Sequence, residues 1–428
     1  MRAIVKRSTI EGTVKAPPSK SYTHRAIVCG LLSKGLTRVS NPLISDDTLA
    51  TVNASRLMGA AITQSEAFEI QGPMELHAPE SEIYCQGSGT TLRIFTALAA
   101  LTKGKCVLTG DKTLQARPVG DLLDGLQQLD TPSRSVLGNG KPPIVVEGRG
   151  LKGGSVKIRG DVTSQYITGL LFACSRGDGN TEIEITTHLE SRPYVEMTLD
   201  VMNLFGVSAM PSETWDHIEV PGSQEYLCPE YSVEGDFSSA AFLLAAGALA
   251  GKAKVTGLKM DSVQGDASML EILHSMGIPV KKTEGSAVVR RSEIQSIDID
   301  ASQNPDLVPI LSVLSTQAEG TTEIRRIGRL KLKESDRIFS VTQELRKMGA
   351  SIEEIHEGLR IKGPTPLHGA ILDPHDDHRI AMAGVVAGLI ADGTTTVEHV
   401  ECVSKSYPRF IQDMKKIGAQ IIIKGDIE

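Results

Sequence analysis

Apolar segments that end in glycine recur along this chain of 428 residues at an almost constant spacing. The glycines are Gly35, Gly104, Gly177, Gly251, Gly320 and Gly393, and successive ones lie 69 to 74 residues apart. Each apolar segment has helical character, so we expect each glycine to cap the C-terminus of a helix. A repeat that spans the whole chain predicts a fold made of similar units.

A second series of glycines alternates with the first. It comprises Gly59, Gly206, Gly277, Gly349 and Gly418, with one member missing near Asp130, and its spacing is 69 to 76 residues. Each of these glycines follows a more polar helical pattern and precedes a short apolar strand pattern. Together the two series predict six copies of an α/β unit.

The helices of the first series are apolar on most faces, a pattern typical of helices that are surrounded by protein. They are expected at residues 21–33, 90–102, 164–174, 238–250, 306–317 and 377–391. The strands and amphipathic helices of three units could enclose three such helices. The predicted fold class is therefore α/β, with two similar lobes of three repeated units each around buried helices.

Composition disfavours several classes of protein. The chain has 52 acidic and 45 basic residues and a formal charge of −7, which disfavours a nucleic-acid partner. Its first residues lack the apolar core of a secretory signal, and the apolar run 240–251 is too short to span a bilayer. We therefore expect a cytoplasmic protein that binds neither nucleic acid nor membranes, and we expect it to be a monomer.

The six cysteines and ten histidines form none of the usual metal motifs. The sequence contains no C-x-x-C pair and no H-E-x-x-H, whereas metal ligands normally cluster at close spacing. Several cysteines lie within apolar runs, where a thiol behaves as a small apolar side chain. We expect reduced cysteines and no metal site.

Hydroxyls, glycines and cations mark the beginnings of four apolar helices. The stretches are Lys20-Ser21-Tyr22-Thr23-His24-Arg25, Gly87-Ser88-Gly89-Thr90-Thr91-Leu92-Arg93, Asp161-Val162-Thr163-Ser164-Gln165 and Asp377-His378-Arg379. A helix N-terminus has unpaired N–H groups and partial positive charge, which suit phosphate. Taken singly, each stretch is explained as well by a Ser, Thr or Asp that acts as an N-cap. Their recurrence beside Arg and Lys favours a site for phosphorylated anions.

Three further stretches carry cations at the beginnings of amphipathic helices. They read Ala116-Arg117-Pro118-Val119-Gly120-Asp121, Lys331-Leu332-Lys333-Glu334-Ser335-Asp336-Arg337 and Ser404-Lys405-Ser406-Tyr407-Pro408-Arg409. The apolar residues after Arg337 follow helical spacing, so Glu334 and Arg337 should lie in or near a first turn. A charge run of this kind, taken alone, is also typical of a solvated helix start.

Together these motifs closely resemble the 5-enolpyruvylshikimate-3-phosphate synthase family of enolpyruvyl transferases. The resemblance also includes Ser191-Arg192-Pro193-Tyr194 and covers nearly the whole chain in the family's order. It implies two inverse α/β lobes of three units each, with an active site in the cleft between them. One lobe would comprise residues 1–19 and 234–428, and the other residues 20–233.

The resemblance also implies which residues bind the two substrates. The site for shikimate 3-phosphate would use Lys20, Ser21, Arg25, Thr163, Ser164, Gln165, Ser191, Tyr194, Asp306 and Lys333. The site for phosphoenolpyruvate would use Lys20, Gly89, Arg117, Gln165, Arg337, Arg379 and Lys405. The chain departs from the family at Arg329, where Asn is common, and at Thr163-Ser164-Gln165, where Ser-Ser-Gln is common. No cofactor is implied.

The implied reaction joins the enolpyruvyl group to the 5-hydroxyl of shikimate 3-phosphate and releases phosphate, a step in aromatic amino-acid biosynthesis. It requires a proton on the methylene carbon of phosphoenolpyruvate and the loss of a proton from the hydroxyl. The catalytic residues would be Asp306 as the base and Glu334, with help from Lys20, as the proton donor. Without the resemblance, Asp306 after Pro305 would be interpreted as a helix cap.

Two other functions compete with this interpretation. The sister enzyme that transfers the enolpyruvyl group to UDP-N-acetylglucosamine usually has a reactive cysteine in the loop before the matching Arg-Pro. That loop reads Thr113-Leu114-Gln115-Ala116 here. A non-catalytic phosphate-binding relative would keep the arginines but would not need both Asp306 and Glu334. The resemblance also places Gly89 beside phosphoenolpyruvate and the inhibitor glyphosate.

Overall fold

The computed structural model describes residues 1–425, and within them the chain forms two compact units. Unit 1 contains Met1–Pro17 and the chain from Glu234 onward, and unit 2 contains Pro18–Val233. Each unit has its own cluster of buried apolar side chains. The chain therefore has two separate hydrophobic cores.

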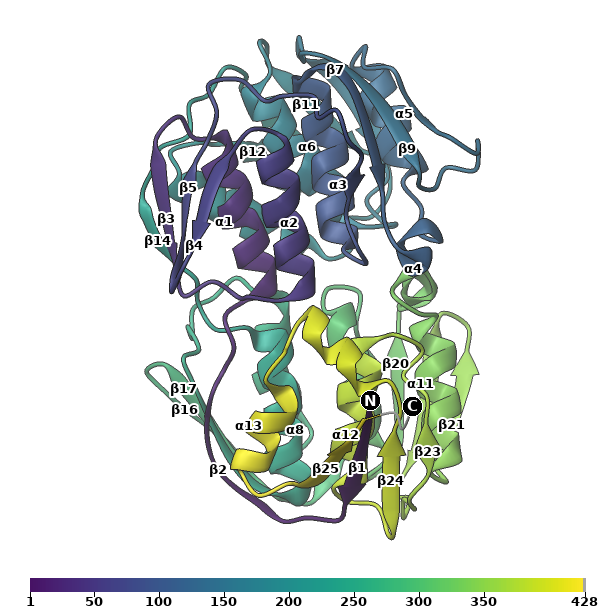
Figure 1. Cartoon of the computed structure of the whole chain (residues 1–428). Coiled ribbons are helices and arrows are strands. Elements are labelled where there is room, and N and C mark those ends of the chain that lie inside the picture. The colour runs from purple at the N-terminus through teal and green to yellow at the C-terminus, as the bar shows by residue number, and fades with distance from the viewer. Residues whose placement is uncertain (426–428) are drawn as a thin grey trace. The chain divides into compact units, whose positions relative to one another are not determined.

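Three buried helices occupy the centre of unit 2. They are α1 (Lys20–Leu32), α3 (Gly89–Leu98) and α6 (Ser164–Arg176), and almost all of their residues are buried. Helix α6 packs against both α3 and α1 (Figure 1). Three outer helices, α2 (Asp46–Leu57), α5 (Gly120–Gln128) and α7 (Arg192–Leu204), bury one side only, as their mixed apolar and polar sequences predict.

Unit 1 has the same arrangement. Its buried helices α8 (Phe237–Ala250), α10 (Val308–Ser315) and α12 (His378–Gly388) contact one another. Its outer helices are α9 (Met269–Ser275), α11 (Arg337–Lys347) and α13 (Phe410–Lys416). A 3-10 turn, η3 (Pro305–Leu307), leads into α10, so Asp306 precedes the α-helix proper.

Three sheets surround the buried helices of each unit. In unit 2 the strand orders are β14-β3-β5-β4, β6-β7-β9-β8 and β10-β11-β13-β12. The strands are β14 (Glu230–Ser232), β3 (Leu36–Ser40), β5 (Ala67–Gln71), β4 (Ala61–Gln64), β6 (Ile83–Tyr84), β7 (Lys103–Thr109), β9 (Ile144–Arg149), β8 (Ser133–Ser135), β10 (Gly154–Ile158), β11 (Thr181–Ile185), β13 (His217–Val220) and β12 (Met210–Pro211).

In unit 1 the strand orders are β16-β17-β15-β2, β18-β20-β22-β21 and β23-β24-β1-β25, and β19 also pairs with β20. The strands are β16 (Val280–Thr283), β17 (Ser286–Arg290), β15 (Gly251–Thr256), β2 (Ile10–Lys15), β18 (Ile294–Gln295), β19 (Ile299–Asp300), β20 (Ala318–Arg325), β22 (Gly358–Gly363), β21 (Ser351–Ile355), β23 (Ile371–Leu372), β24 (Thr394–Val397), β1 (Arg2–Lys6) and β25 (Gln420–Lys424).

In each sheet the four strands named above in order form one parallel pair, at one edge, and two antiparallel pairs. Strands β1 and β2 complete two sheets of unit 1 whose other strands come from residues beyond 250. Six sheets with one common pattern confirm the predicted α/β fold of six repeated units.

The two glycine series have different structural roles. All of Gly59, Gly206, Gly277, Gly349 and Gly418 have positive φ, and each directly follows the C-cap residue of an outer helix. This is the left-handed position after a helix C-cap, which glycine adopts at little cost. At the missing member of the series Asp130 itself has φ of 56° after α5, so an aspartate adopts the same conformation.

The predicted capping role of the first series is largely wrong. Only Gly177 and Gly251 are C-cap residues. The other four, Gly35, Gly104, Gly320 and Gly393, lie beyond the C-cap, just before or within the next strand. Gly320 and Gly393 have φ of 107° and 89°, so these glycines allow the chain to turn from a buried helix into a strand.

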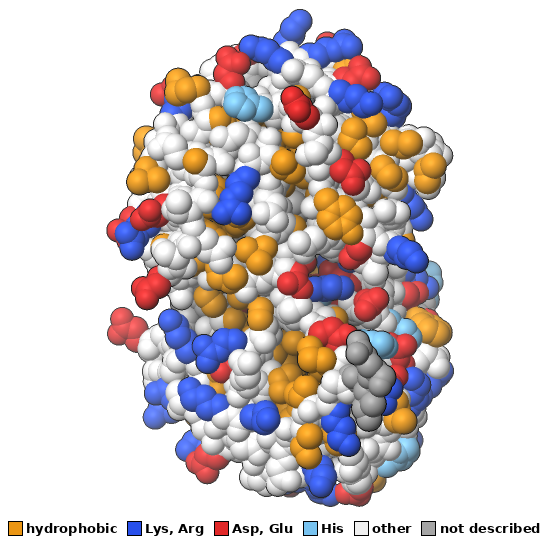
Figure 2. Space-filling model, viewed as in Figure 1, with side chains coloured by type: hydrophobic (Ala, Val, Ile, Leu, Met, Phe, Trp, Pro, Cys, Tyr) orange, Lys and Arg blue, Asp and Glu red, His pale blue; other side chains and the backbone are white. Residues whose placement is uncertain are grey.

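Both signs of charge occur over the viewed face of each unit in Figure 2. Among the described residues, no helix is both long enough and apolar enough to cross a membrane. All six cysteines are free thiols, and only Cys228 is exposed.

Candidate active site

The buried helices of unit 2 begin with hydroxyl caps. The side chains of Ser19, Ser88 and Thr163 accept hydrogen bonds from the backbone N–H groups of the first turns of α1, α3 and α6. The N-cap interpretation is therefore confirmed for Ser88 and Thr163, whereas the cap of α1 is Ser19, one residue before the stretch that begins at Lys20. A cap satisfies only part of the unpaired N–H groups at a helix end, so a capped helix can still bind an anion there.

Lys20 and Arg25 lie on α1 with different partners. The Nζ of Lys20 is 2.8 Å from a carboxylate oxygen of Asp47, the second residue of α2. The buried guanidinium of Arg25 donates to Thr198 and to the backbone oxygens of Ser21 and Tyr194. Burial lowers the pKa of Arg25 to about 10, and it remains a cation at neutral pH.

Gly89, Arg117 and Gln165 come together in unit 2. A Cβ atom built on Gly89 would lie 3.0 Å from Nη1 of Arg117 and 3.6 Å from Oε1 of Gln165. Nη1 of Arg93 donates to that Gln165 oxygen over 2.6 Å. The amide nitrogen of Gln165 donates to Thr90 over 2.9 Å. Two guanidinium groups and an amide thus surround the first residue of α3.

The other residues predicted in unit 2 lie at the beginnings of α6 and α7. Thr163 caps α6 and Ser164 is its first residue. Ser191 precedes α7 in the left-handed conformation, with φ of 54°, and is buried. Tyr194 lies in the first turn of α7, where its backbone oxygen accepts from Arg25. Tyr194 therefore belongs to the surroundings of Arg25.

In unit 1 a buried guanidinium joins three carboxylates. Arg337, the first residue of α11, is 1% exposed. Its Nη1, Nη2 and Nε atoms are each 2.7 Å from carboxylate oxygens of Asp306, Glu334 and Asp377, respectively. Burial would lower the pKa of Arg337, but these three carboxylates raise it well above its usual value. Both predicted catalytic carboxylates are therefore fixed by one cation.

Two more predicted cations contact Asp306. Nη2 of Arg379 is 2.9 Å and Nζ of Lys333 is 3.7 Å from its carboxylate. Burial would raise the pKa of Asp306, but Arg379, Lys333 and Arg337 together hold it well below its usual value. Burial lowers the pKa of Lys333 to about 8, although Asp306 partly opposes this shift. Asp306 is thus an anion and Lys333 largely a cation at neutral pH.

Lys405 and Arg329 both donate hydrogen bonds to backbone oxygens of unit 1. The Nζ of Lys405 donates to the backbone oxygen of Asp376, just before α12, over 2.8 Å. Arg329, in the 3-10 turn η4 (Gly328–Leu332), donates to the backbone oxygen of Ser302. We therefore find Arg329 in contact with the backbone of its own unit.

Sequence reasoning gave no role to three residues that hold the site together. Asp47 binds Lys20, Arg93 binds Gln165, and Asp377 binds Arg337. Arg93 and Asp377 stand inside motifs that carry the family resemblance, so position in a motif could have identified them. Asp47 lies in no such motif, and only the packing of α2 against α1 places it beside Lys20.

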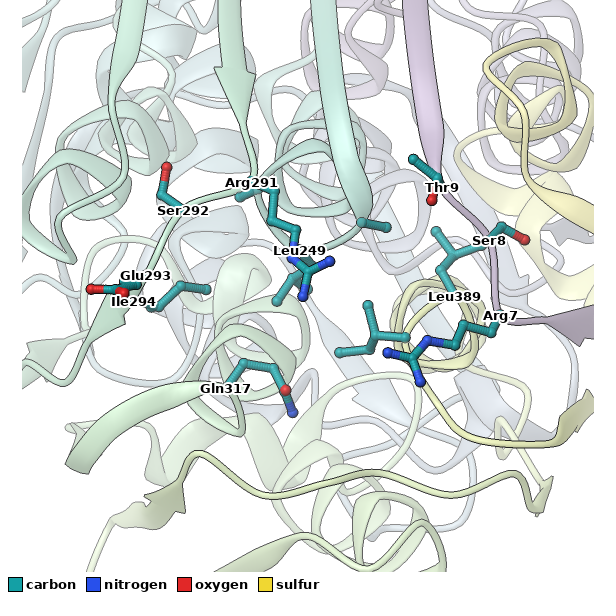
Figure 3. Close-up of a pocket in the computed structure, with 13 residues that line it drawn as sticks. Arg7, Ser8, Thr9, Leu249, Arg291, Ser292, Glu293, Ile294, Gln317 and Leu389 are labelled. Atoms are coloured by element: carbon teal, nitrogen blue, oxygen red, sulfur yellow. The ribbon is translucent and has the colours of Figure 1, made fainter.

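A cavity of about 390 Å³ lies elsewhere in unit 1, near the C-terminal ends of α8 and α12 (Figure 3). Its lining includes Arg7, Leu249, Arg291, Gln317 and Leu389. None of the predicted site residues lines it. Residues 1–425 contain no cluster of His, Cys, Asp and Glu suited to a metal ion.

Comparisons with known proteins agree with the fold and the motifs. A family model described as EPSP synthase (3-phosphoshikimate 1-carboxyvinyltransferase) matches residues 4–414. A 3-phosphoshikimate 1-carboxyvinyltransferase of Methanocorpusculum labreanum is 44% identical over 98% of this chain and 99% of its own length. The enzyme of that name from Methanothrix thermoacetophila is 46% identical over 97% and 98%.

A solved structure of EPSP synthase from Acinetobacter baumannii matches with a TM-score of 0.83. It is 26% identical to this chain, and the match covers 99% of both chains. The similarity thus extends over both units and all six repeats. With its motifs, fold and full-length relatives in agreement, this chain belongs to the EPSP synthase (3-phosphoshikimate 1-carboxyvinyltransferase) family.

Proposed function

We propose that this protein transfers the enolpyruvyl group of phosphoenolpyruvate to the 5-hydroxyl of shikimate 3-phosphate and releases phosphate. Membership of the family and full-length relatives that bear the enzyme's name support this activity. The observation that carries it is the arrangement of Asp306 and Glu334 on one buried guanidinium, that of Arg337. A protein that only binds phosphate would need the cation but not both carboxylates.

Asp306 is proposed as the general base that takes the proton of the 5-hydroxyl. Its pKa lies well below the usual value, chiefly because three cations outweigh the effect of burial. Such a carboxylate is a weak base, so the hydroxyl would lose its proton only as its oxygen attacks C2 of the enol. Asp306 would then accept the proton in the transition state, where the developing positive charge on the hydroxyl oxygen makes the hydroxyl proton acidic.

Glu334 is proposed as the proton donor to the methylene carbon, with help from Lys20. Arg337 holds Glu334 in place at 2.7 Å through one carboxylate oxygen, and a carboxyl group that carries a proton can donate it. Protonation of the methylene makes C2 electrophilic, and the hydroxyl then adds to it. The tetrahedral adduct finally expels phosphate while its methyl group returns a proton to Glu334, which restores the carbon–carbon double bond. The departing phosphate takes the proton that Asp306 had accepted from the hydroxyl.

The cations and helix N-termini are proposed to bind the anionic groups of both substrates. Shikimate 3-phosphate would be bound by the residues named for it at the beginnings of α1, α6 and α7, with Asp306 and Lys333. Phosphoenolpyruvate would be bound by Lys20, Gly89, Arg117 and Gln165 of unit 2 and by Arg337, Arg379 and Lys405 of unit 1. The proposal requires the named residues of unit 1 and those of unit 2 to act on the same pair of substrates. We further propose that the enzyme is a monomer and that it acts in the cytoplasm.

Phosphate release tests the proposal directly. The protein is incubated with phosphoenolpyruvate and either shikimate 3-phosphate or UDP-N-acetylglucosamine, and free phosphate is measured over time. We expect release with shikimate 3-phosphate only. Release with the sugar nucleotide would favour the sister transferase, and no release with either acceptor would favour a non-catalytic relative.

A further inference from the structure

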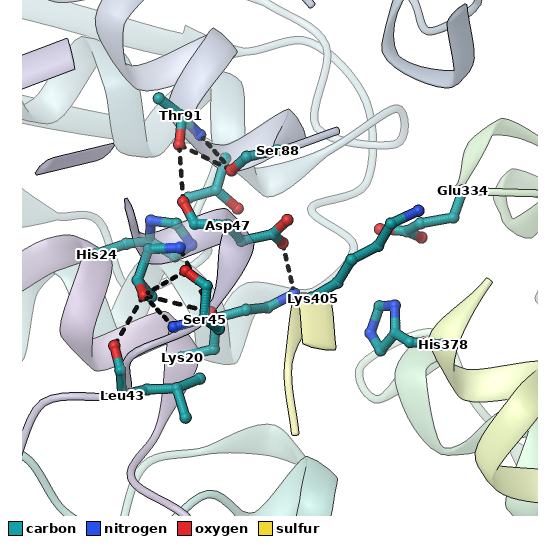
Figure 4. A network of polar contacts seen from close by, with 12 residues as sticks. Lys20, His24, Leu43, Ser45, Asp47, Ser88, Thr91, Glu334, His378 and Lys405 are labelled. Atoms are coloured by element: carbon teal, nitrogen blue, oxygen red, sulfur yellow. Dashed lines mark hydrogen bonds and ion pairs between the residues drawn. The ribbon is translucent and has the colours of Figure 1, made fainter. Parts of the chain in front are cut away.

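Four buried polar side chains of unit 2 form a continuous chain of hydrogen bonds, which we call the hydroxyl chain. Nδ1 of His24 lies 2.6 Å from the hydroxyl of Thr51, which lies 2.7 Å from that of Thr91. The hydroxyl of Thr91 donates over 2.7 Å to that of Ser88. Each of the four residues is at most 1% exposed. Figure 4 shows His24, Thr91 and Ser88 in this network.

Both ends of the hydroxyl chain adjoin residues proposed to bind phosphoenolpyruvate. His24 follows Lys20 by one turn of α1, and Ser88 and Thr91 flank Gly89 at the start of α3. Helix α2 supplies the middle of the chain and also Asp47, whose carboxylate binds Lys20. The three helices α1, α2 and α3 are thus connected within their N-terminal halves by polar contacts.

Water cannot compete for these bonds, because all four side chains are buried. Burial, and the charges of Lys20 and Arg25, lower the pKa of His24 well below its usual value, so its ring is neutral. A neutral imidazole has one donor and one acceptor nitrogen, so Nδ1 either donates to Thr51 or accepts from it. Because the hydroxyl of Thr91 donates to Ser88, all three bonds form only when Nδ1 donates to Thr51 and Thr51 donates to Thr91. The hydroxyl protons then align in one direction, which strengthens neighbouring bonds.

Stability alone does not require a polar chain at this place. Replacing both partners of a buried hydrogen bond with apolar groups of the same shape can be nearly neutral, so valines could fill the same volume. Hydrogen bonds differ from apolar contacts in that they fix direction as well as distance. The hydroxyl chain therefore fixes the first turn of α3 in a way that apolar packing would not.

We propose that the hydroxyl chain is a positioning device that holds Gly89 in its place relative to Lys20 and thereby sets the affinity for phosphoenolpyruvate. This inference rests on the proposed function. The four side chains are buried and act through Lys20 and Gly89, so they are positioning residues.

Replacing Thr51 tests the proposal. Thr51→Val keeps the shape but removes the two bonds that the Thr51 hydroxyl makes, to His24 and to Thr91. We expect the KM for phosphoenolpyruvate to rise at least fivefold. The kcat and the KM for shikimate 3-phosphate should change less than threefold, and Thr51→Ser should restore the parent value. The control is Thr96→Val, because the buried hydroxyl of Thr96 bonds only within α3, to the backbone oxygen of Leu92.

Hydrogen exchange gives a second measurement that does not depend on activity. We expect the amides of residues 89–93 to exchange at least tenfold faster in Thr51→Val than in the parent or in Thr96→Val. If Thr51→Val does not fold, Thr91→Val interrupts the same chain and replaces it in both measurements.

The outcomes separate this inference from the proposed function. An inactive parent protein would contradict the function, and the exchange rates alone would then decide whether the chain positions α3. An active parent, with unchanged KM and unchanged exchange in Thr51→Val, would overturn the inference while the function stands.

Discussion

Replacing Gly89 with alanine tests how the proposed site binds phosphoenolpyruvate. It is the first residue of α3, and its φ lies outside the left-handed region, so its backbone does not require glycine. A Cβ atom there would lie 2.9 Å from Nη1 of Arg93 and 3.0 Å from Nη1 of Arg117. Contacts between such atoms are normally about 3.5 Å, so each guanidinium would have to move by about 0.5 Å.

We expect Gly89→Ala to fold as well as the parent. Alanine in a helix is more favourable than glycine by up to about 1 kcal/mol, which would offset the displacement of two flexible side-chain ends. For a protein of this size a change of that order shifts Tm by no more than about 2–4 °C. Thermal unfolding of Gly89→Ala and of the parent under the same conditions measures this difference in Tm.

Ligand binding should respond more strongly than stability. A hydrogen bond to a charged group contributes about 1.5–3 kcal/mol, and a displaced Arg117 would lose part of it. A loss of about 1–2 kcal/mol corresponds to a KM for phosphoenolpyruvate raised roughly 5- to 30-fold. Glyphosate is longer than phosphoenolpyruvate and would occupy more of the space beside Gly89, so its inhibition constant should rise further. The KM for shikimate 3-phosphate should stay within about twofold.

Gly120→Ala is the matched control, because Gly120 is also the first residue of a helix, α5. Its Cβ would lie 3.6 Å from Gly140, an ordinary contact, and would meet no arginine. We expect this variant to match the parent in every constant. Equal inhibition by glyphosate in Gly89→Ala and the parent would refute the steric reasoning, and a large fall in Tm would show that the backbone needs glycine.

Three further predictions concern unit 1. Asp306→Asn and Glu334→Gln should each lower kcat by about 100-fold or more in the phosphate-release assay, whereas Glu323→Gln, which alters a carboxylate bound to exposed arginines, should not. Because the pKa of Lys333 is about 8, kcat/KM for shikimate 3-phosphate should fall as pH rises through 8, and Lys333→Arg should move that fall to higher pH. Burial and nearby Asp306 raise the pKa of Asp266 to about 7. Between about pH 4 and 7 the folded state therefore keeps a proton on Asp266 that the unfolded state has lost, and the free energy of unfolding falls as pH rises through this range. Asp266→Asn should therefore raise Tm more at pH 8 than at pH 5, and equal shifts at both would contradict this.

The sequence by itself determined the repeated architecture. Outer helices end at glycines such as Gly59 and Gly349 because a left-handed residue after a helix is a local requirement that glycine meets at little cost. Asp130 meets the same requirement, and the spacing had already placed a member of the series there. The buried helices could be recognised for a similar reason, since an apolar side chain on every face leaves burial as the only stable environment.

Sequence patterns located the first turns of the helices that carry the site, because caps and cations lie within a few residues of each other. They did not reveal which partners those residues meet. Lys20 and Asp47 are 27 positions apart, and Arg337 and Asp377 are 40 apart. Such pairs are decided by how whole helices pack. The tertiary structure alone therefore decided that one buried guanidinium, that of Arg337, would hold both proposed catalytic carboxylates, because a buried charge has to be paired wherever packing places it.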